Sequence, residues 1–417
     1  MNRLRQLWRY SCKTYDLGVR LRQTREDRLQ PRIPLAPVVT SLFLGASLRV
    51  RSFLKLGKKT RKRNWQRLVR YPQPLNHEAF NYVSEFIRLD DLRENLYVVA
   101  RCAKANKALE RWKLGGLLVL ALDANELFAR RSHCCEACCS RKIKVTGADG
   151  QTVEVTEYYH RAVFAHLVGA DLLLDLEPIR PGEEECAAAL RLLGRLRRRL
   201  GPRFFDVVTA DAWYTKTPFL QAVRKLGWEA VVVLKQADYH ASQEAQALRP
   251  RQAQELFEHQ GRQVQLREVR DLTLTQKAQP KVRVVSAEES WEERRRQGQT
   301  WTRQRKESRW QWVATEGLDH LPVKTIWLIG HGRWAIENHG FNQLTQYYHL
   351  THCYHHHPIA IEAWLLILLL AVNVTTLFFR HWVGPRVEAD YTLSDLIEEC
   401  CEDLVQEADW ERCLDTS

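Results

Sequence analysis

Three acidic residues, far apart in the sequence, could form one metal site if the fold brings them together. Asp123 follows a short apolar run in "GGLLVLALDANELF", Asp211 ends the run "FFDVVTAD", and Glu337 lies in "RWAIEN". Converging carboxylates repel one another strongly, and a divalent cation relieves that repulsion. Oxygen ligands that leave positions open for water and phosphate suit Mg²⁺ or Mn²⁺. Two such ions about 4 Å apart would activate an attacking hydroxyl and stabilise a leaving one in phosphoryl transfer.

Each acid also has an ordinary structural role that the sequence leaves open. Asp211 could cap the helix that follows it, and Asp123 could stand in a turn. Glu337 could pair with Arg333, which lies four residues earlier and therefore on the same face of a helix. For any single acid the structural role is the commoner one. The occurrence of all three at strand ends and on a neighbouring helix favours a shared function.

The elements around the two aspartates predict an α/β domain. Apolar runs that end at Asp123 and that fill residues 157–169 and 171–179 predict three strands joined by hairpins. The next segments are predicted as helix, strand, helix and strand, at 183–201, 204–211, 217–227 and 229–235. This order implies a mixed sheet flanked by helices, in which the first and fourth strands can lie side by side. Because ligands bind beyond the carboxyl ends of such strands, Asp123 and Asp211 would face one crevice.

The pattern then changes twice. Residues 237–325 alternate apolar and polar side chains, which predicts an inserted antiparallel β segment, with the charged stretch 291–307 as an excursion between its strands. The core resumes afterwards, and a helix carrying Glu337 is expected from about Gly332. The apolar run 363–379 nearly reaches the length of a membrane span, but polar residues interrupt it, and we expect a buried core helix.

The positive charge is concentrated near the N-terminus. The formal net charge is +13, and the first 100 residues hold 21 basic and 8 acidic residues, whereas the other 317 hold 42 of each. A basic helical region therefore predicts a polyanionic partner, with DNA ahead of a membrane surface. The expected DNA contacts there are the basic residues of one turn: Lys58, Lys59, Arg61, Lys62 and Arg63. Residues 388–417 hold 11 acids and one base, Arg412, which predicts a solvated acidic helix or a segment that shields the basic region.

Four regions follow from these patterns. The predicted boundaries are 1–112 for a helical, basic DNA-binding region, 113–236 with 326–382 for the catalytic core, 237–325 for the β-rich insertion, and 383–417 for the acidic helical tail. The chain begins "MNRLRQLWRYSCK", without the apolar segment of a secretory signal, so we expect a cytoplasmic protein.

Three stretches of the chain resemble the DDE transposases of bacterial insertion sequences. They are "LALDANELF", "VVTADAWYTKTPFLQAVRKLGWEAVVVLKQ" and "GRWAIENHGFNQLTQYYHLTHCYHH", and the resemblance covers roughly residues 110–380. It implies a ribonuclease H-like fold with a β-strand insertion, two-metal chemistry with Mg²⁺, nicking at element ends and strand transfer by a 3′-hydroxyl. The catalytic triad that it implies is Asp123, Asp211 and Glu337. It also implies double-stranded DNA as the partner, a homodimer on that DNA, and association with the bacterial nucleoid.

The chain departs from the family signature around the glutamate. That signature has Tyr, then Arg three residues on, Glu four further and Lys seven further. Arg333 and Glu337 match it, whereas Gly330 and Leu344 stand at the Tyr and Lys positions. The phosphate and flipped-base contacts of those two family residues are therefore not carried over, while the metal ligands are unaffected.

Further candidates for DNA contact lie near the acids. Arg333 and Lys235 are candidate phosphate ligands, because guanidinium binds anions in a bidentate manner and ammonium acts as a point charge. Trp213 and Tyr214 could stack on an extruded base, or they could pack the start of the next helix.

The cysteines raise a separate hypothesis. The 11 Cys are expected to be reduced thiols in a cytoplasmic protein. In "HCCEACC", Cys135 and Cys138 have the spacing of half a structural zinc site, and "HCYHHH" at 352–357 could supply the rest. The alternative is an inert loop beside polar histidines.

Three functions remain open at this level. The first is a DNA transposase with an Asp-Asp-Glu triad. The second is a metal-dependent DNA nuclease on the same fold, because fold and triad do not determine the acceptor of the reaction. The third is a DNA-binding protein that descends from a transposase and no longer cuts DNA.

Overall fold

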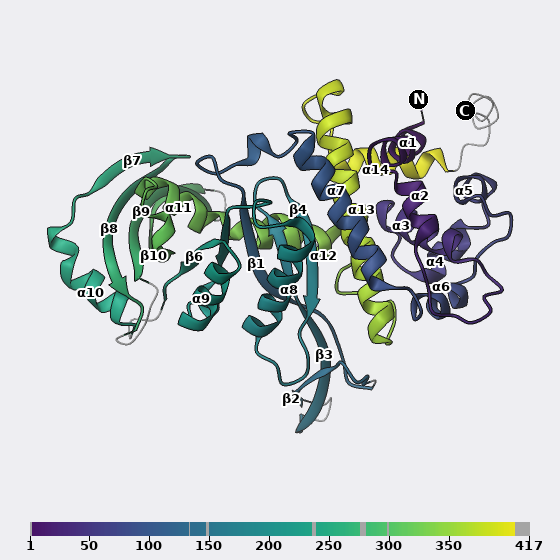
Figure 1. Ribbon diagram of the computed structural model, residues 1–417, viewed down its shortest axis with the longest axis horizontal. Coiled ribbons are helices and arrows are strands. Elements are labelled where there is room, and N and C mark those ends of the chain that lie inside the picture. Colours follow the sequence, from purple (N-terminus) through teal and green to yellow (C-terminus); the bar gives the residue numbers. More distant parts are fainter. Residues whose placement is uncertain are drawn as a thin grey trace.

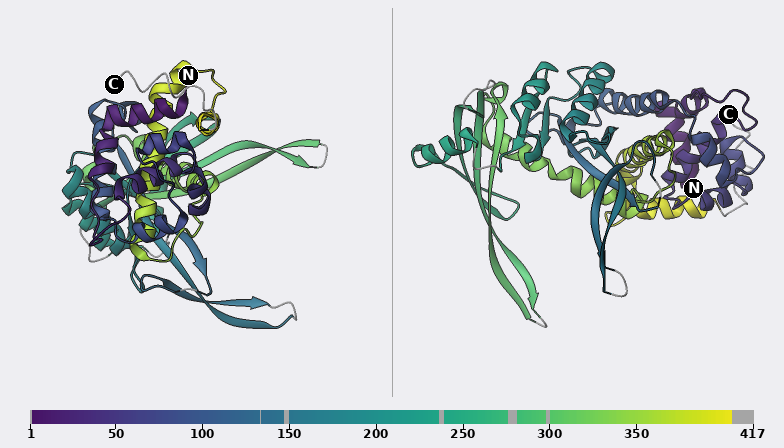
Figure 2. Two further views of the ribbon diagram at one scale, coloured as in Figure 1. Left: turned by 90° about the vertical axis from the view of Figure 1, so that its right-hand side faces the viewer. Right: turned by 90° about the horizontal axis from the view of Figure 1, so that it is seen from below.

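A helical body and an extended sheet make up the protein, shown as a computed structural model in Figures 1 and 2. The structure describes residues 2–132, 134–146, 150–235, 239–275, 281–297 and 300–404. The helical body contains α1 (Arg3–Tyr15), α2 (Leu17–Gln23), α3 (Leu35–Ser47), α4 (Phe53–Lys59), α5 (Arg63–Val69), α6 (His77–Ser84) and α7 (Leu89–Ala105). The predicted helical character of the first 112 residues is thus confirmed.

The sheet has the strand arrangement of a ribonuclease H-like fold. Its strands are β1 (Val119–Arg130), β2 (Cys139–Thr146), β3 (Thr152–Leu167), β4 (Leu172–Pro178), β5 (Val207–Ala210) and β6 (Glu229–Val233), followed by β7 (Glu255–His259), β8 (Arg262–Thr273), β9 (Lys281–Gln297) and β10 (Thr300–Thr315). β1, β5 and β6 run parallel, and β3 pairs antiparallel with β1 on one side and with β4 on the other. The mixed sheet and the pairing of the first and fourth core strands match the prediction.

The β-rich insertion extends the central sheet. β10 pairs antiparallel with β6, with Trp312 opposite Val233, and the order continues through β9 and β8 to β7. A strand edge that would otherwise be unpaired is thereby covered. Figure 1 shows these strands curving away from β6 on the left of the view.

Residues 291–297 and 300–307 of the charged stretch belong to two long strands, so the expected excursion is wrong. β9 and β10 stay in register from Val282 opposite Thr315 to Gln297 opposite Thr300. Opposite charges face each other across this hairpin, as in the ion pair of Glu292 with Arg303 at 3.4 Å. Such cross-strand pairs suit an arm that is solvated on both faces. Figure 2 shows the β9–β10 and β2–β3 hairpins as two arms on the same side of the molecule.

Further α-helices of the described chain are α8 (Glu185–Leu200), α9 (Thr217–Lys225), α10 (His240–Leu248), α11 (Val323–Gly332), α12 (Asn342–Tyr348), α13 (Pro358–Phe378) and α14 (Leu393–Asp403). Of these, α8, α9, α11 and α13 contact the core strands, and α10 contacts the insertion. α8 begins with Glu185 and ends with Arg197, Arg198 and Arg199, which complements the helix dipole. The helical run toward Glu337 begins at Val323, so the predicted start near Gly332 is wrong; Pro322 at the N-cap marks the true start.

Helix α13 joins the helical body to the sheet. It contacts α3 and α7 of the helical body and β4 of the sheet. The helical stretch Pro358–Arg386 is long and apolar enough to cross a membrane, but 94% of its most apolar window is buried inside the protein. The expectation of a core helix is therefore confirmed. Asn373 is satisfied there, because its side chain bonds the backbone N–H and C=O of Leu173 in β4.

Helix α14 packs against α1. Leu396, Ile397 and Cys400 are buried on it, so the expectation of a solvated helix is wrong for this part of the tail. Glu399 pairs with Arg3 at 2.9 Å, and the Asp403 carboxylate accepts the backbone N–H of Leu4 at 3.0 Å. The acids thus neutralise part of the basic N-terminal helix.

Candidate active site

Parallel pairing of β1 with β5 places the two aspartates side by side. The last matched pair is Leu122 with Ala210, and Asp123 and Asp211 are the next residue on each strand. The sequence predicted that β1 ends at Asp123, and this prediction is wrong. β1 continues to Arg130, paired with β3. The parallel pairing ends there because the chain of β5 turns away after Ala210. The two carboxylates therefore lie at the carboxyl edge of the parallel strands, where such sheets bind ligands.

Backbone hydrogen bonds orient both aspartates. Oδ1 of Asp123 accepts the N–H of Ala124 at 2.8 Å, and Oδ1 of Asp211 accepts the N–H of Trp213 at 2.8 Å. The second bond caps a short 3₁₀ turn, Ala212–Tyr214. Asp211 is thus a cap, as one hypothesis proposed, and it also lies beside Asp123.

Glu337 reaches the same place from a π-helical turn, Ile336–Phe341. Nη1 of Arg333 lies 2.5 Å from Oε1 of Glu337 and 3.4 Å from Oδ2 of Asp123. The ion pair of Arg333 with Glu337 therefore exists, and the same guanidinium also contacts Asp123. π-helical turns are rare and occur often at functional sites.

One arginine is insufficient to neutralise this carboxylate cluster, which we define as Asp123, Asp211 and Glu337. Burial raises the pKa of Asp123, the charge of Arg333 opposes that rise, and the charges of Asp211 and Glu337 add to it, so the pKa reaches about 7. The Asp123 side chain is 17% exposed and that of Glu337 is 46% exposed. The cluster thus has excess negative charge and an open side.

The donor set of the cluster fits a hard divalent cation. All of its side-chain donors are carboxylate oxygens, which Mg²⁺ and Mn²⁺ prefer. A cation would relieve the repulsion that raises the Asp123 pKa. The open side at Glu337 leaves room for water or phosphate ligands.

Packing explains the two departures from the family signature. A Cβ atom at Gly330 would lie 2.4 Å from Nε1 of Trp312, so the β10 indole fills the space beside this position. Leu344 is completely buried. Trp312 could not be assigned to the site from the sequence, because only the pairing of β10 with β6 brings it beside α11.

The candidate DNA contacts differ in exposure. Trp213 is 56% exposed, and the Nζ of Lys216 lies 4.7 Å from its ring centroid. No sequence motif marked Lys216 as a site residue. Tyr214 is completely buried and packs edge-on against Phe219 of α9. Of its two possible roles, Tyr214 therefore packs the start of the next helix and is not placed to stack on a base. Lys235 is exposed just beyond β6.

The basic turn between α4 and α5 is largely open to solvent. Four of its five candidate residues are exposed and Lys59 is half-buried; the exposed ones are Lys58, Arg61, Lys62 and Arg63.

The buried carboxylate of Glu289 fastens the insertion to α11. Glu289 of β9 accepts hydrogen bonds from Nε1 of Trp327 at 2.9 Å and from Nη1 of Arg262 at 3.0 Å, and its Oε1 lies 2.5 Å from Nε2 of His331. Burial alone would raise its pKa, but the bonds and charge of His331, together with the bonds of Trp327 and Arg262, lower it to about 2. Glu289 thereby positions the helix that leads to Arg333.

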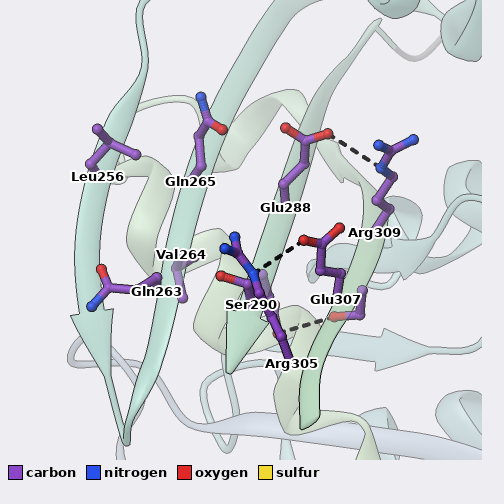
Figure 3. A pocket seen from close by; sticks show the side chains of 11 residues that line it. Leu256, Gln263, Val264, Gln265, Glu288, Ser290, Arg305, Glu307 and Arg309 are labelled. Carbon is purple, nitrogen blue, oxygen red and sulfur yellow. Dashed lines mark hydrogen bonds and ion pairs between the residues drawn. The ribbon is translucent and has the colours of Figure 1, made fainter. Parts of the chain in front are cut away.

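The outer surface of the insertion carries a pocket that is separate from the carboxylate cluster. Figure 3 shows its lining on β7 to β10, where Glu288 faces Arg309 and Glu307 faces Arg305. The Nε–carboxylate distance is 3.3 Å in both ion pairs. These opposite charges compensate one another, unlike those of the carboxylate cluster.

Cys135 and Cys138 lie in the connection between β1 and β2, with their sulfur atoms 3.5 Å apart. They are not part of the carboxylate cluster. The "HCYHHH" stretch lies between α12 and α13.

A family model matches the larger part of the chain. Residues 148–374, more than half of the chain, match the family described as the transposase DDE domain. The chain therefore belongs to the DDE transposase family. The match includes Asp211 and Glu337 and begins after Asp123.

The solved structures that are similar to the chain include one of a transposase. It is the cryo-EM structure of a piggyBac transposase synaptic complex with hairpin DNA, with 10% sequence identity and a TM-score of 0.42, covering 99% of this chain and 84% of that one. No curated protein matches the sequence.

Proposed function

We propose that the protein is a transposase that cuts and joins transposon-end DNA by phosphoryl transfer, with Asp123, Asp211 and Glu337 as ligands of two divalent ions. The observation that carries the proposal is that Asp123 and Glu337 converge on one arginine at the edge of the parallel strands, where the strand register places Asp211 beside Asp123. Bound Mg²⁺ would activate the attacking hydroxyl and stabilise the leaving oxygen.

The three acids have different mobility in this proposal. Asp123 lies on β1 and Asp211 directly follows β5, and both carboxylates accept hydrogen bonds from main-chain N–H groups. Glu337 is half-exposed on a π-helical turn, so its carboxylate can adjust to incoming ligands. Two fixed acids would define the site, and the third would close it around the scissile phosphate.

Arg333 would act in two states. Without a cation its guanidinium neutralises part of the charge of Asp123 and Glu337. When a cation neutralises those carboxylates, the guanidinium becomes free to bind a phosphate oxygen. Trp213, exposed two residues after Asp211, would stack on a base near the cut, because stacking tolerates any base.

DNA would also bind the basic turn of α4 and α5. Phosphate neutralisation releases counterions, so the logarithm of the binding constant falls with the logarithm of salt by roughly 0.9 per contacted phosphate. Reversing the charges of Lys58, Arg61 and Lys62 together should flatten this slope by about two to three. An unchanged slope would place the DNA elsewhere.

The decisive experiment uses a supercoiled plasmid that carries the gene with its flanking DNA. We expect cleavage that requires Mg²⁺ or Mn²⁺ and is lost in Asp211→Asn, while DNA binding survives. Asp390→Asn, an exposed acid before α14, is the matched control and should cut normally.

Each result separates the three functions. Joined products identify a transposase, cut but unjoined DNA identifies a nuclease, and binding without any cut identifies a silent DNA-binding protein. Equal cleavage by Asp211→Asn and wild type would reject the ligand assignment.

A further inference from the structure

Three metal-binding side chains converge at the base of the β2–β3 arm, away from the carboxylate cluster. Cys135 and Cys138 lie in the β1–β2 connection, and His160 lies on β3. Nε2 of His160 is 3.5 Å from Sγ of Cys135 and 3.3 Å from Sγ of Cys138, and the two sulfurs are 3.5 Å apart. A CxxC turn thus faces a buried imidazole.

These distances agree with those around one tetrahedral zinc ion. With Zn–S of ~2.3 Å and Zn–N of ~2.0 Å, tetrahedral angles give S···S of about 3.8 Å and S···N of about 3.5 Å. The observed Sγ–Sγ distance of 3.5 Å also far exceeds the length of a disulfide bond, ~2.05 Å. The three atoms are therefore spaced as ligands that share an ion.

The sheet fixes the position of His160. It is paired with Phe128 on β1, its side chain is nearly buried, and its ring packs 5.1 Å from that of Phe128. This pairing holds the imidazole beside the start of the β1–β2 connection. The backbone N–H of Cys138 bonds the carbonyl of Cys135 at 3.1 Å, which closes the CxxC turn.

Cys353 and His356, in the segment before α13, interact electrostatically with Cys138 and with His160, although neither belongs to the group of three converging donors. Sγ of Cys353 is 3.7 Å from Nε2 of His356. The same segment is tied to the helical body, because Tyr354 donates to the carbonyl of Val50 at 3.2 Å.

We propose that Cys135, Cys138 and His160 bind a structural zinc ion, and that Cys353 or His356 supplies the fourth ligand. Two thiolates with imidazole are a zinc donor set, in contrast to the all-oxygen cluster at Asp123. The ion would fasten the base of the β2–β3 arm to the segment before α13, and through it to the helical body.

The test is the metal content of the purified full-length protein by mass spectrometry. We expect about one zinc per chain in the wild type and less than about a tenth of that in Cys135→Ser and His160→Ala. Cys102→Ser, a half-buried thiol on α7, is the matched control and should keep its zinc. A wild type without zinc that also fails to take up added Zn²⁺ would overturn the proposal, as would full zinc in Cys135→Ser.

Cobalt substitution identifies the ligand atoms. Co²⁺ bound by thiolates gives a sulfur-to-metal charge-transfer band, which should be absent in Cys135→Ser and present in Asp123→Asn. If Cys135→Ser does not fold, Cys138→His keeps a ligand at that position and should show a weaker band. A band of unchanged strength in Cys138→His would contradict the assignment.

The fourth ligand has its own readout. The fourth ligand is the residue whose substitution lowers the zinc affinity, either Cys353→Ser or His356→Ala. Unchanged affinity in both variants would show that this segment does not bind the ion. Chelation of zinc should also speed amide hydrogen exchange in β2 and β3 while leaving the β9–β10 arm unchanged. Equal exchange in both arms with and without zinc would contradict the fastening role.

Discussion

Asp123, which is half-buried, and Glu289, which is buried, are carboxylates in one continuous sheet, and their surroundings drive their pKa values in opposite directions. Glu289 has four side-chain partners, His331, Trp327, Arg262 and Ser308, and its pKa falls to about 2. Asp123 shares one arginine with Glu337 and lies beside Asp211, and its pKa rises to about 7. A carboxylate whose bonds are satisfied holds elements together, whereas one left short of positive charge is suited to a cation.

The largest expected effect is on DNA cleavage, which should depend on Asp123 more than on Glu289. Asp123→Asn should reduce DNA cleavage by at least about a hundredfold, because removal of a direct ligand should exceed the loss seen for groups that only orient ligands. Its melting temperature should stay the same or rise, since the change removes one of three repelling charges. Plasmid cleavage measures the activity, and thermal unfolding of the same sample measures the melting temperature. Normal cleavage by Asp123→Asn would show that Asp123 is not a metal ligand and differs from Glu289 only in its surroundings.

The next effect concerns stability. Glu289→Ala should lower the free energy of unfolding by about 3 kcal/mol, because it leaves His331 and Arg262 without their buried partner. Glu288→Ala is the matched control on the same strand, and it should cost less than about 1 kcal/mol because its ion pairs lie near the surface. Chemical denaturation measures both, and equal losses would show that Glu289 has no special role.

The stabilisation by Glu289 should depend on pH. The folded pKa of Glu289 is about 2, below its ordinary value of 4.5, so its stabilisation is complete above pH 4.5 and disappears as the pH falls toward 2. The stability difference between wild type and Glu289→Ala should therefore shrink over that interval. Denaturation at pH 6 and at pH 3 tests it, and a constant difference would contradict the lowered pKa.

The smallest effect tests the need of the cluster for a cation. Mg²⁺ at ten times its dissociation constant should stabilise the wild type by about 1.4 kcal/mol, because it binds only the folded state. Glu289→Ala should retain this increment and Asp123→Asn should lose it. Thermal unfolding with and without Mg²⁺ provides the measurement, and an increment that survives in Asp123→Asn would place the ion elsewhere.

Some residues of the two candidate sites have a signal in the local sequence, and others have none. Strand-ending acids and the Arg333–Glu337 spacing are local signals, and the strand order that follows from hydrophobic runs was enough to place Asp123 beside Asp211. The roles of Trp312 and His160 had no local signal. Trp312 reaches α11 only through the pairing of β10 with β6, and His160 reaches the CxxC turn only through the pairing of β3 with β1.

Two of the wrong predictions came from local charge. The stretch 291–307 is too charged for a buried strand, but a projecting hairpin needs no buried face and is stabilised by pairing alone. The acidic tail likewise looked solvated, although Leu396, Ile397 and Cys400 share one face of α14 and pack on α1.

By itself the sequence determined the class of fold, the concentration of positive charge in the first hundred residues and the three acids that could share a cation. These depend on residue type, periodicity and chain order. Only the tertiary structure decided that one arginine serves two of those acids, that Glu289 fastens the insertion to α11, and that His160 faces the two cysteines. Those contacts join residues distant in the chain, and long-range packing sets them.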